Sequence, residues 1–168
     1  MTIVKRAADF AELAHKGQFR KYTHEPYIVH PKEVARIVSI VTPDLNVVAA
    51  AWLHDVVEDT PTTIETIDSE FNSRVAKLVS EVTNVGAGRG NRAARKRLER
   101  EHLAQACPDA KTIKLADILD NVPSIVEFDP DFADIYVAEK QMLLPHLLGG
   151  SPILANRVQE MLDWRVEY

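Results

Sequence analysis

Apolar residues recur at intervals of three and four along most of this 168-residue chain, and no convincing strand-like alternation of apolar and polar residues is found. Near the N-terminus, Val4, Ala7, Ala11 and Ala14 would share one side of a helix. Spacing close to the 3.6-residue helical period predicts amphipathic helices that bury one face in a core. The pattern therefore predicts an all-α fold, a single-domain bundle of roughly eight to ten helices.

Residues that favour helix ends mark the boundaries of these helices. Thr2, Asp44 and either Asn72 or Ser73 are suited to N-caps, because a short polar side chain can accept a hydrogen bond from a free backbone N–H. Gly17 suits the left-handed end of a helix. Pro123 is expected to interrupt a helix, because proline lacks a backbone donor and clashes with the preceding turn. The predicted helices cover residues 2–16, 31–41, 44–58, 61–71, 72–82, 92–107, 109–122, 131–148 and 152–166. Because the segment 85–91 contains three glycines, we expect it to be a mobile loop.

The length favours one domain over residues 1–168, since a chain of this size can bury a single substantial core. The sequence lacks the run of about twenty apolar residues that a membrane helix needs, and it has no signal-peptide pattern. We therefore expect a cytoplasmic protein with no membrane association. Cys107 is the only cysteine, which excludes an internal disulfide and a thiolate metal site.

The net charge of −5 argues against nucleic-acid binding, because phosphodiester backbones would meet an acidic surface on average. Basic residues nevertheless cluster between Arg89 and Arg100, and such a patch can serve a smaller phosphate ligand. Glu99 and Glu101 lie in the same segment, so a solvated helix face with balanced charges is the alternative interpretation. Apolar residues near the C-terminus, including Trp164, fit either additional core or an oligomer face, and both a monomer and a homodimer stay open.

The run AAWLHDVVEDT (50–60) carries the most distinctive chemistry of the chain. On one continuous helix, His54 would share a face with Glu58, and Asp55 with Asp59. Burying the carboxylate of Asp55 among apolar neighbours is costly unless a cation or several donors compensate its charge. A divalent metal ion is the simplest such partner.

Two further residues could join the same ion: His30, at the start of a helix, and Asp117, on a distant helix. Imidazole and carboxylate ligands together suit manganese, iron or zinc better than calcium, which takes oxygen ligands only. Each residue also has a structural explanation on its own. A histidine on an apolar helix is often a hydrogen-bonded core residue, and Asp117 could pair with Lys114 or Lys111.

Four segments together resemble HD-domain metal-dependent phosphohydrolases, and within them the hydrolase domain of the RelA/SpoT type and the small alarmone hydrolases. The segments are AHKGQFRKYTHEPYIVHP (14–31), AAWLHDVVEDT (50–60), VAKLVSEVTN (75–84) and KLADILDNV (114–122). They lie in a family-like core of about residues 5–125, followed by C-terminal helices over about 126–168. The resemblance implies an HD-type bundle that removes the 3′-pyrophosphate from guanosine tetra- or pentaphosphate, giving GDP or GTP and pyrophosphate.

The resemblance also implies one divalent ion, usually Mn²⁺, with Fe²⁺ or Zn²⁺ as alternatives. The residues that match the family's functional positions are His30, His54, Asp55 and Asp117 as metal ligands, Glu58 and Asp59 as the catalytic pair, Arg20 and Lys21 at the nucleotide and its phosphates, Tyr27 at the nucleoside, and Asn121 toward the nucleotide. A carboxylate one turn from the ion can accept a proton from the attacking water, and Glu58 is our choice for that base, with Asp59 orienting the water. Their order could be reversed. An exposed loop pair is the alternative for Arg20 and Lys21, and core packing is the alternative for Tyr27.

The chain departs from the family pattern around its KLAD motif. Ile118 and Asp120 stand where the family has a basic residue and a histidine, and Pro123 stands where an arginine is common. Tyr22 replaces a residue that is often small. The extra carboxylate of Asp120 and the missing arginine weaken the positive field around a polyphosphate, and two other functions stay open. One is a phosphatase of another phosphorylated nucleotide, such as the 2′-phosphate of NADPH, and the other is a non-catalytic nucleotide-binding HD module.

Overall fold

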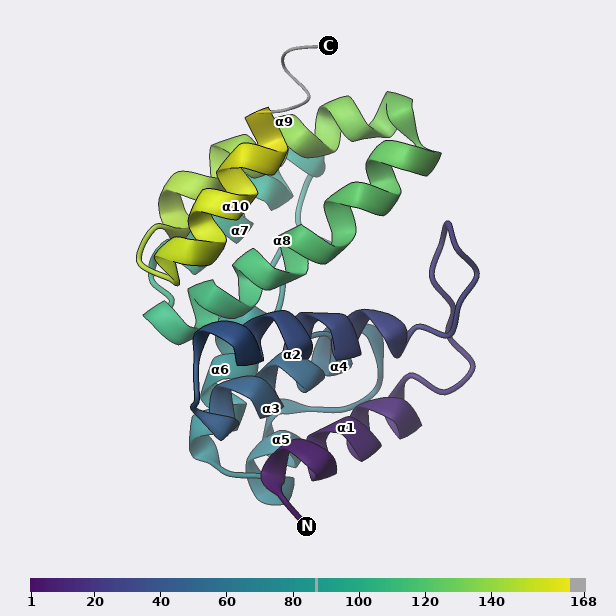
Figure 1. Cartoon of the computed structure of the whole chain (residues 1–168), viewed down its shortest axis with the longest axis vertical. Helices are drawn as coiled ribbons and strands as arrows, with labels where there is room; N and C mark the ends of the chain where they lie inside the picture. The colour runs from purple at the N-terminus through teal and green to yellow at the C-terminus, as the bar shows by residue number, and fades with distance from the viewer. Residues whose placement is uncertain (87, 164–168) are drawn as a thin grey trace. The chain divides into compact units, whose positions relative to one another are not determined.

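The computed structural model describes residues 1–86 and 88–163, and helices α1 to α10 account for most of them (Figure 1). Within these residues no β-strand occurs, and Phe19 and Pro26 form an isolated bridge. The predicted all-α fold is confirmed. No helix formed by these residues has the length and apolar character that crossing a membrane requires.

The chain divides into two compact units, Met1–Thr83 and Asn84–Tyr168. The first contains α1 (Ile3–Ala14), α2 (Val29–Val41), α3 (Leu45–Leu53), α4 (Val56–Asp59), α5 (Ile64–Glu70) and α6 (Ser73–Val82). The second contains α7 (Arg92–Ala104), α8 (Pro108–Phe128), α9 (Pro130–Leu147) and α10 (Pro152–Asp163). That residues 1–168 form one domain stays a prediction.

Helix α3 is the centre of the first unit, where it packs against α1, α2 and α6. Its residues from Val47 to Ala51 are all buried, as is Leu53. A helix that is apolar on every side must be enclosed on every side, and the run of alanines lets neighbouring helices approach closely. The residues that follow α3 are therefore held on a rigid, buried support.

Local capping explains where several helices begin. The side chains of Thr2, Asp44 and Asn72 accept hydrogen bonds from backbone N–H groups in the first turns of α1, α3 and α6. Gly17 follows α1 with a φ of +84°, in the left-handed region that favours glycine. These predicted helix boundaries are confirmed.

The predicted continuous helix over residues 44–58 is wrong, because α3 ends at Leu53 and α4 begins at Val56. The Nδ1 atom of His54 lies 2.8 Å from the carbonyl oxygen of Ala51. A side chain that bonds a carbonyl of the preceding turn competes with the helical hydrogen-bond pattern. The break places the HD pair at a turn instead of on a helix face.

The predicted interruption at Pro123 is also wrong, because α8 runs through it to Phe128. The ring of Pro123 is exposed, whereas Val122 and Ile125 on either side are buried. Packing of these neighbours holds both halves of the helix in place despite the missing backbone donor. The proline therefore costs one hydrogen bond without ending the helix.

The C-terminal helices follow the predicted pattern within the described residues. In the second unit, α8 packs against α9 and α10, and α7 packs against α9. The turn between α9 and α10 contains Gly150, where an added Cβ atom would lie 2.9 Å from the backbone nitrogen of Thr112. The predicted extension of the last helix through residues 164–166, including Trp164, lies outside the described residues. So does Ala87 of the predicted mobile loop, and the mobility of that loop stays a prediction.

Candidate metal centre

Three predicted ligands converge in the first unit. His30 lies in the first turn of α2, and His54 and Asp55 lie between α3 and α4. Both histidines are almost completely buried, at 1% and 3% exposure. Their Nε2 atoms are 3.2 Å apart. The Oδ2 atom of Asp55 lies 3.1 Å from Nε2 of His54 and 3.4 Å from Nε2 of His30.

This triangle of donor atoms has the dimensions of a metal site. Nitrogen and oxygen ligands lie about 2.0–2.2 Å from an ion such as zinc, so neighbouring ligands at tetrahedral or octahedral angles are roughly 3.0–3.5 Å apart. In the neutral ring of His54, the bond to Ala51 requires the hydrogen on Nδ1, which leaves the Nε2 lone pair available for an ion. Two imidazoles and a carboxylate suit a divalent transition metal. The residues present therefore fit the predicted ion.

The carboxylate of Asp55 is held in its charged form. Burial alone would raise the pKa of Asp55, but the adjacent His54 and His30 rings outweigh burial and hold this pKa well below its usual range. The hydroxyl of Tyr27 also donates a hydrogen bond of 2.6 Å to Oδ2 of Asp55. The Tyr27 ring packs edge-on against His30, with ring centroids 5.8 Å apart. Tyr27 thus supports two candidate ligands, while its contact with a nucleoside stays a prediction.

The predicted catalytic pair, Glu58 and Asp59, lies on the short helix α4, directly after the candidate ligands. Both residues are exposed, as groups that meet a substrate must be. Partial burial of its carboxyl group and the nearby charge of Asp55 raise the pKa of Asp59. The backbone oxygen of Asp59 accepts a hydrogen bond of 3.0 Å from the side chain of Gln18. Their catalytic roles stay predictions.

His15 and Gln18, which were not among the predicted site residues, lie beside Tyr27 and Asp59. His15 is 2% exposed, and its Nδ1 atom lies 2.7 Å from Oε1 of Gln18. The His15 ring packs against Tyr27 with centroids 4.8 Å apart. In the described part of the chain, Nε2 of His15 has no hydrogen-bond partner. The signal was present in the AHKGQ segment, where a histidine and a glutamine three residues apart follow an amphipathic helix.

The predicted phosphate-binding pair lies on a loop of the connector between α1 and α2. The bridge between Phe19 and Pro26 closes this loop, and the backbone N–H of Arg20 donates to the carbonyl of Glu25 over 2.8 Å. Lys21 is exposed, and its Nζ atom lies 3.0 Å from the hydroxyl of Tyr22 and 4.6 Å from the centre of the Tyr22 ring. The contact of Arg20 and Lys21 with a nucleotide stays a prediction.

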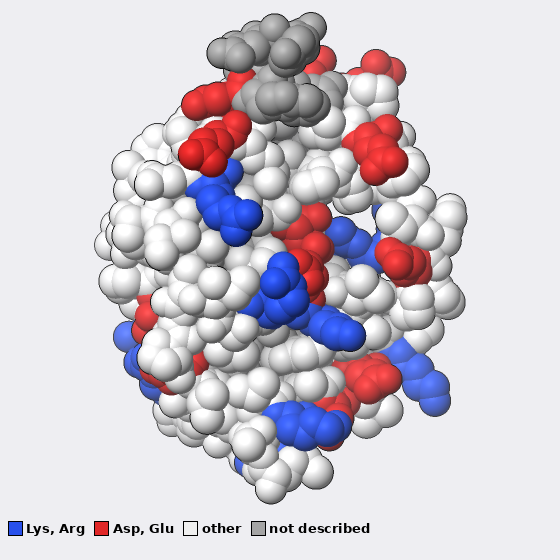
Figure 2. All heavy atoms as spheres, in the orientation of Figure 1, with Lys and Arg blue, Asp and Glu red and all other residues white. Residues whose placement is uncertain are grey.

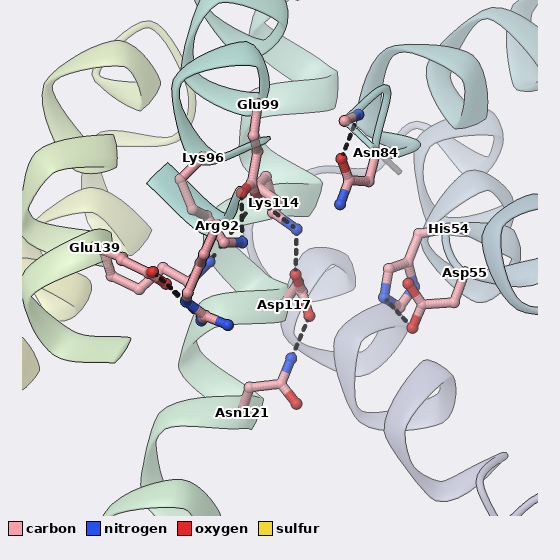
Figure 3. A network of polar contacts seen from close by, with 12 residues as sticks. His54, Asp55, Asn84, Arg92, Lys96, Glu99, Lys114, Asp117, Asn121 and Glu139 are labelled. Carbon is pink, nitrogen blue, oxygen red and sulfur yellow. Dashed lines mark hydrogen bonds and ion pairs between the residues drawn. The ribbon is translucent and has the colours of Figure 1, made fainter. Parts of the chain in front are cut away.

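The two remaining predicted site residues, Asp117 and Asn121, lie one turn apart on α8 in the second unit. Asn121 donates a hydrogen bond of 2.5 Å to Oδ1 of Asp117, and Lys114 donates one of 2.8 Å to Oδ2 (Figure 3). Of the two lysines considered as partners from sequence, Lys114 makes the pair, whereas Lys111 donates to the carbonyl of Ala104. That Asp117 completes the ligand set of the ion stays a prediction.

The predicted basic cluster between Arg89 and Arg100 has its basic side chains exposed or partly exposed, with one buried carboxylate, Glu99, among them. Arg97 pairs with Glu101 at 3.7 Å on an exposed face, as expected for balanced charges. Glu99, in contrast, is buried and accepts a hydrogen bond of 2.6 Å from Lys96. On the face drawn in Figure 2, acidic and basic side chains are interspersed. The basic cluster thus forms specific ion pairs in addition to a solvated face.

Known proteins resemble this chain over most of its length. The family model of the HD domain matches residues 7–138. The human guanosine-3′,5′-bis(diphosphate) 3′-pyrophosphohydrolase MESH1 is 41% identical in an alignment of 164 positions that covers 96% of this chain and 79% of the human protein. A guanosine-3′,5′-bis(diphosphate) 3′-pyrophosphohydrolase of Aquifex aeolicus is 37% identical over 98% of this chain, but the match covers only 24% of that protein.

Solved structures show the same relationship. A metazoan ortholog of SpoT, described as hydrolysing ppGpp, matches with a TM-score of 0.90 and 31% identity, covering 98% of this chain and 96% of the other. The structure of lmo0812 from Listeria monocytogenes matches with a TM-score of 0.72 and 28% identity, covering 88% of this chain and all of the other. The chain belongs to the HD domain family. Within that family it is strongly similar to proteins of the MESH1 and SpoT type.

Proposed function

We propose that this chain is a metal-dependent hydrolase that removes the 3′-pyrophosphate from guanosine tetra- or pentaphosphate, giving GDP or GTP and pyrophosphate. The observation that carries the proposal is the likeness, over nearly the whole chain, to relatives named for this reaction. The donor triangle of His30, His54 and Asp55 supports it independently, because such a site fits the ion that this hydrolysis needs. We also propose a cytoplasmic location, a monomer or homodimer, and no nucleic-acid partner.

The proposed ion is Mn²⁺, held by His30, His54, Asp55 and Asp117. When bound, it would lower the pKa of a water molecule and neutralise charge on a phosphoryl oxygen. Tyr27 keeps Asp55 oriented through its hydrogen bond, and Asn121 does the same for Asp117. These two hydrogen bonds fix the orientations of the Asp55 and Asp117 side chains before an ion binds.

Side chains of this protein would accept the proton of the attacking water and balance the negative charge of the phosphates. Glu58 accepts a proton from the attacking water while Asp59 orients that water. The water oxygen forms a bond to the phosphorus attached to the 3′ oxygen, and the bond between this phosphorus and the 3′ oxygen breaks. The 3′ oxygen leaves with the nucleotide and takes up a proton. Arg20 and Lys21 balance the negative charge of the phosphates, because phosphoryl transfer depends mainly on positioning and electrostatic stabilisation.

The test is product analysis with purified, manganese-loaded protein and ppGpp. We expect equal amounts of GDP and pyrophosphate, with no release of single phosphates. The variants Glu58→Gln and Asp59→Asn should lose most turnover, whereas Glu12→Gln, at an exposed position on α1, should retain it.

Parallel reactions with NADPH separate the alternative activity, because a 2′-phosphatase releases single phosphates. Turnover of NADPH with no turnover of ppGpp would contradict the proposed substrate. Binding of ppGpp without any turnover, unchanged by Glu58→Gln, would contradict the proposed catalysis and indicate a binding module.

A further inference from the structure

A cluster of buried charges surrounds Glu99 in the second unit (Figure 3). Glu99 comes from α7, Lys114 from α8 and Lys140 from α9. The Nζ atoms of Lys114 and Lys140 each lie 3.8 Å from Oε1 of Glu99, and Lys96 donates a hydrogen bond of 2.6 Å to Oε2. Three lysines therefore share one buried carboxylate, and of the three only Lys140 is itself fully buried.

Stability does not explain why Lys140 is part of this cluster. Lys140 is 3% exposed, and its ammonium group lies beyond hydrogen-bond distance of Glu99 and 4.7 Å from the centre of the Tyr136 ring. Moving a charge out of water has a large free-energy cost, and apolar replacements of buried ion pairs are often neutral or stabilising. An apolar residue could fill the same space, so we look for a function of the positive charge of Lys140 other than stabilising the fold.

The cluster leads directly to the candidate ligand Asp117. The ammonium group of Lys114 lies 2.8 Å from Oδ2 of Asp117, in addition to its 3.8 Å separation from Glu99. Both carboxylates attract the same ammonium group, so the charge on Glu99 decides how strongly Lys114 neutralises Asp117. Lys140 in turn decides how much of the Glu99 charge is available to Lys114.

We propose that Glu99 and Lys140 are positioning residues that set, through Lys114, the orientation and the effective negative charge that Asp117 presents to a divalent cation. The inference rests on the proposed function, in which Asp117 is a metal ligand. It goes further by assigning opposite roles to two buried residues outside the ligand set. Glu99 strengthens cation binding, and Lys140 limits it.

The two roles predict affinity changes of opposite sign. Glu99→Gln leaves the lysines without their shared counter-charge and concentrates Lys114 on Asp117, so manganese binding should weaken roughly tenfold, as expected for one unit charge near a divalent ion. Lys140→Met removes a positive charge and keeps the apolar stem, so binding should strengthen by roughly threefold to tenfold. The double variant should return to within about twofold of the wild type, because the two changes compensate.

The experiment is a titration of Mn²⁺ into chelator-stripped full-length protein, with free Mn²⁺ measured by electron paramagnetic resonance and thermal unfolding followed in parallel. Glu101→Gln on the exposed face of α7 and Lys77→Met on α6 are the matched controls, because both side chains are largely exposed. Affinity shifts of opposite sign in Glu99→Gln and Lys140→Met support the inference. Weaker binding in both variants, or no change in either, overturns it in favour of a structural role.

Asp117→Asn separates this inference from the function beneath it. Weakened manganese binding by Asp117→Asn, together with unshifted binding by the Glu99 and Lys140 variants, overturns the inference alone. Wild-type affinity in Asp117→Asn overturns the proposed ligand set, and the inference with it. If Glu99→Gln does not fold, Lys140→Met decides the matter, since tighter binding by a buried-charge deletion is not expected from structural damage.

Discussion

The hydroxyl of Tyr27 provides a direct test of how the candidate metal centre is held. It donates a hydrogen bond of 2.6 Å to Oδ2 of Asp55, the oxygen that also faces both histidines. Tyr27→Phe removes one oxygen atom and keeps the ring that packs against His15 and His30. The substitution therefore isolates the hydrogen bond from the packing.

The expected magnitude follows from the charge on the acceptor. A hydrogen bond to a charged group contributes about 1.5–3 kcal/mol. Every 1.4 kcal/mol corresponds to about tenfold in a binding constant, so the dissociation constant for Mn²⁺ should rise roughly ten- to hundredfold. Loss of groups that orient metal ligands typically has an effect of about this size.

The assay is the titration of Mn²⁺ into metal-free protein, with Tyr22→Phe as the control. Tyr22 also carries a hydrogen-bonded hydroxyl, but its partner is the exposed side chain of Lys21, so manganese affinity should not change. Wild-type affinity in Tyr27→Phe would refute the reasoning. An equal loss in both variants would also refute it, because the effect would then not arise at Asp55.

Three further predictions concern stability. Burial alone would raise the pKa of Glu99, but the surrounding lysines lower this pKa from 4.5 to about 2. At pH values above the pKa that Glu99 has in the unfolded chain, the carboxylate therefore adds about 3 kcal/mol to the free energy of unfolding. The free energy of unfolding of the wild type relative to Glu99→Gln should fall by that amount between about pH 5 and pH 2; a constant difference in urea titrations would contradict this. Burial and the charge of Lys114 lower the pKa of Lys140 from 10.5 to about 8. The unfolded chain then binds more protons between these values, so wild-type stability relative to Lys140→Met should rise from about pH 8 to pH 10.5, and a flat difference in the same assay would exclude it. Asn72→Ala removes the cap of α6 and the bond to Asn46 and should lower the free energy of unfolding by about 1–2 kcal/mol; the exposed Asn156→Ala is the control, and equal stability of the two variants would count against the capping role.

Much of the fold could be predicted from sequence because helix periodicity and capping are local. Thr2, Asp44 and Asn72 accept hydrogen bonds from N–H groups only two or three residues away, so a few neighbouring residues are enough to predict their capping role. The break after Leu53 was not predictable in the same way, because the apolar pattern continues through His54 and Asp55. The contact between the His54 ring and the carbonyl of Ala51 accounts for the break, and the sequence around a histidine does not reveal such a contact.

Part of the candidate site could likewise be predicted from sequence, and part could not. The convergence of His30 with the HD pair was predicted from a motif whose chemistry requires it, and the first unit brings these three residues together. The buried cluster around Glu99 was not predicted, since its members are separated by up to 44 positions in the chain. Only Lys96 and Glu99 belong to the basic segment between Arg89 and Arg100, whereas Lys114 and Lys140 come from α8 and α9. Long-range burial, unlike periodicity, leaves little trace in sequence.

The most direct test of the account measures metal content and turnover in the same samples. Chelator-stripped protein is titrated with Mn²⁺, and pyrophosphate release from ppGpp is recorded at each occupancy for the wild type, His54→Ala and the exposed control His146→Ala. We expect one ion per chain in the wild type and the control, turnover that rises in proportion to occupancy, and loss of both in His54→Ala. Pyrophosphate release by metal-free protein, or full occupancy and turnover in His54→Ala, would contradict the claim that a histidine-held ion supports this hydrolysis.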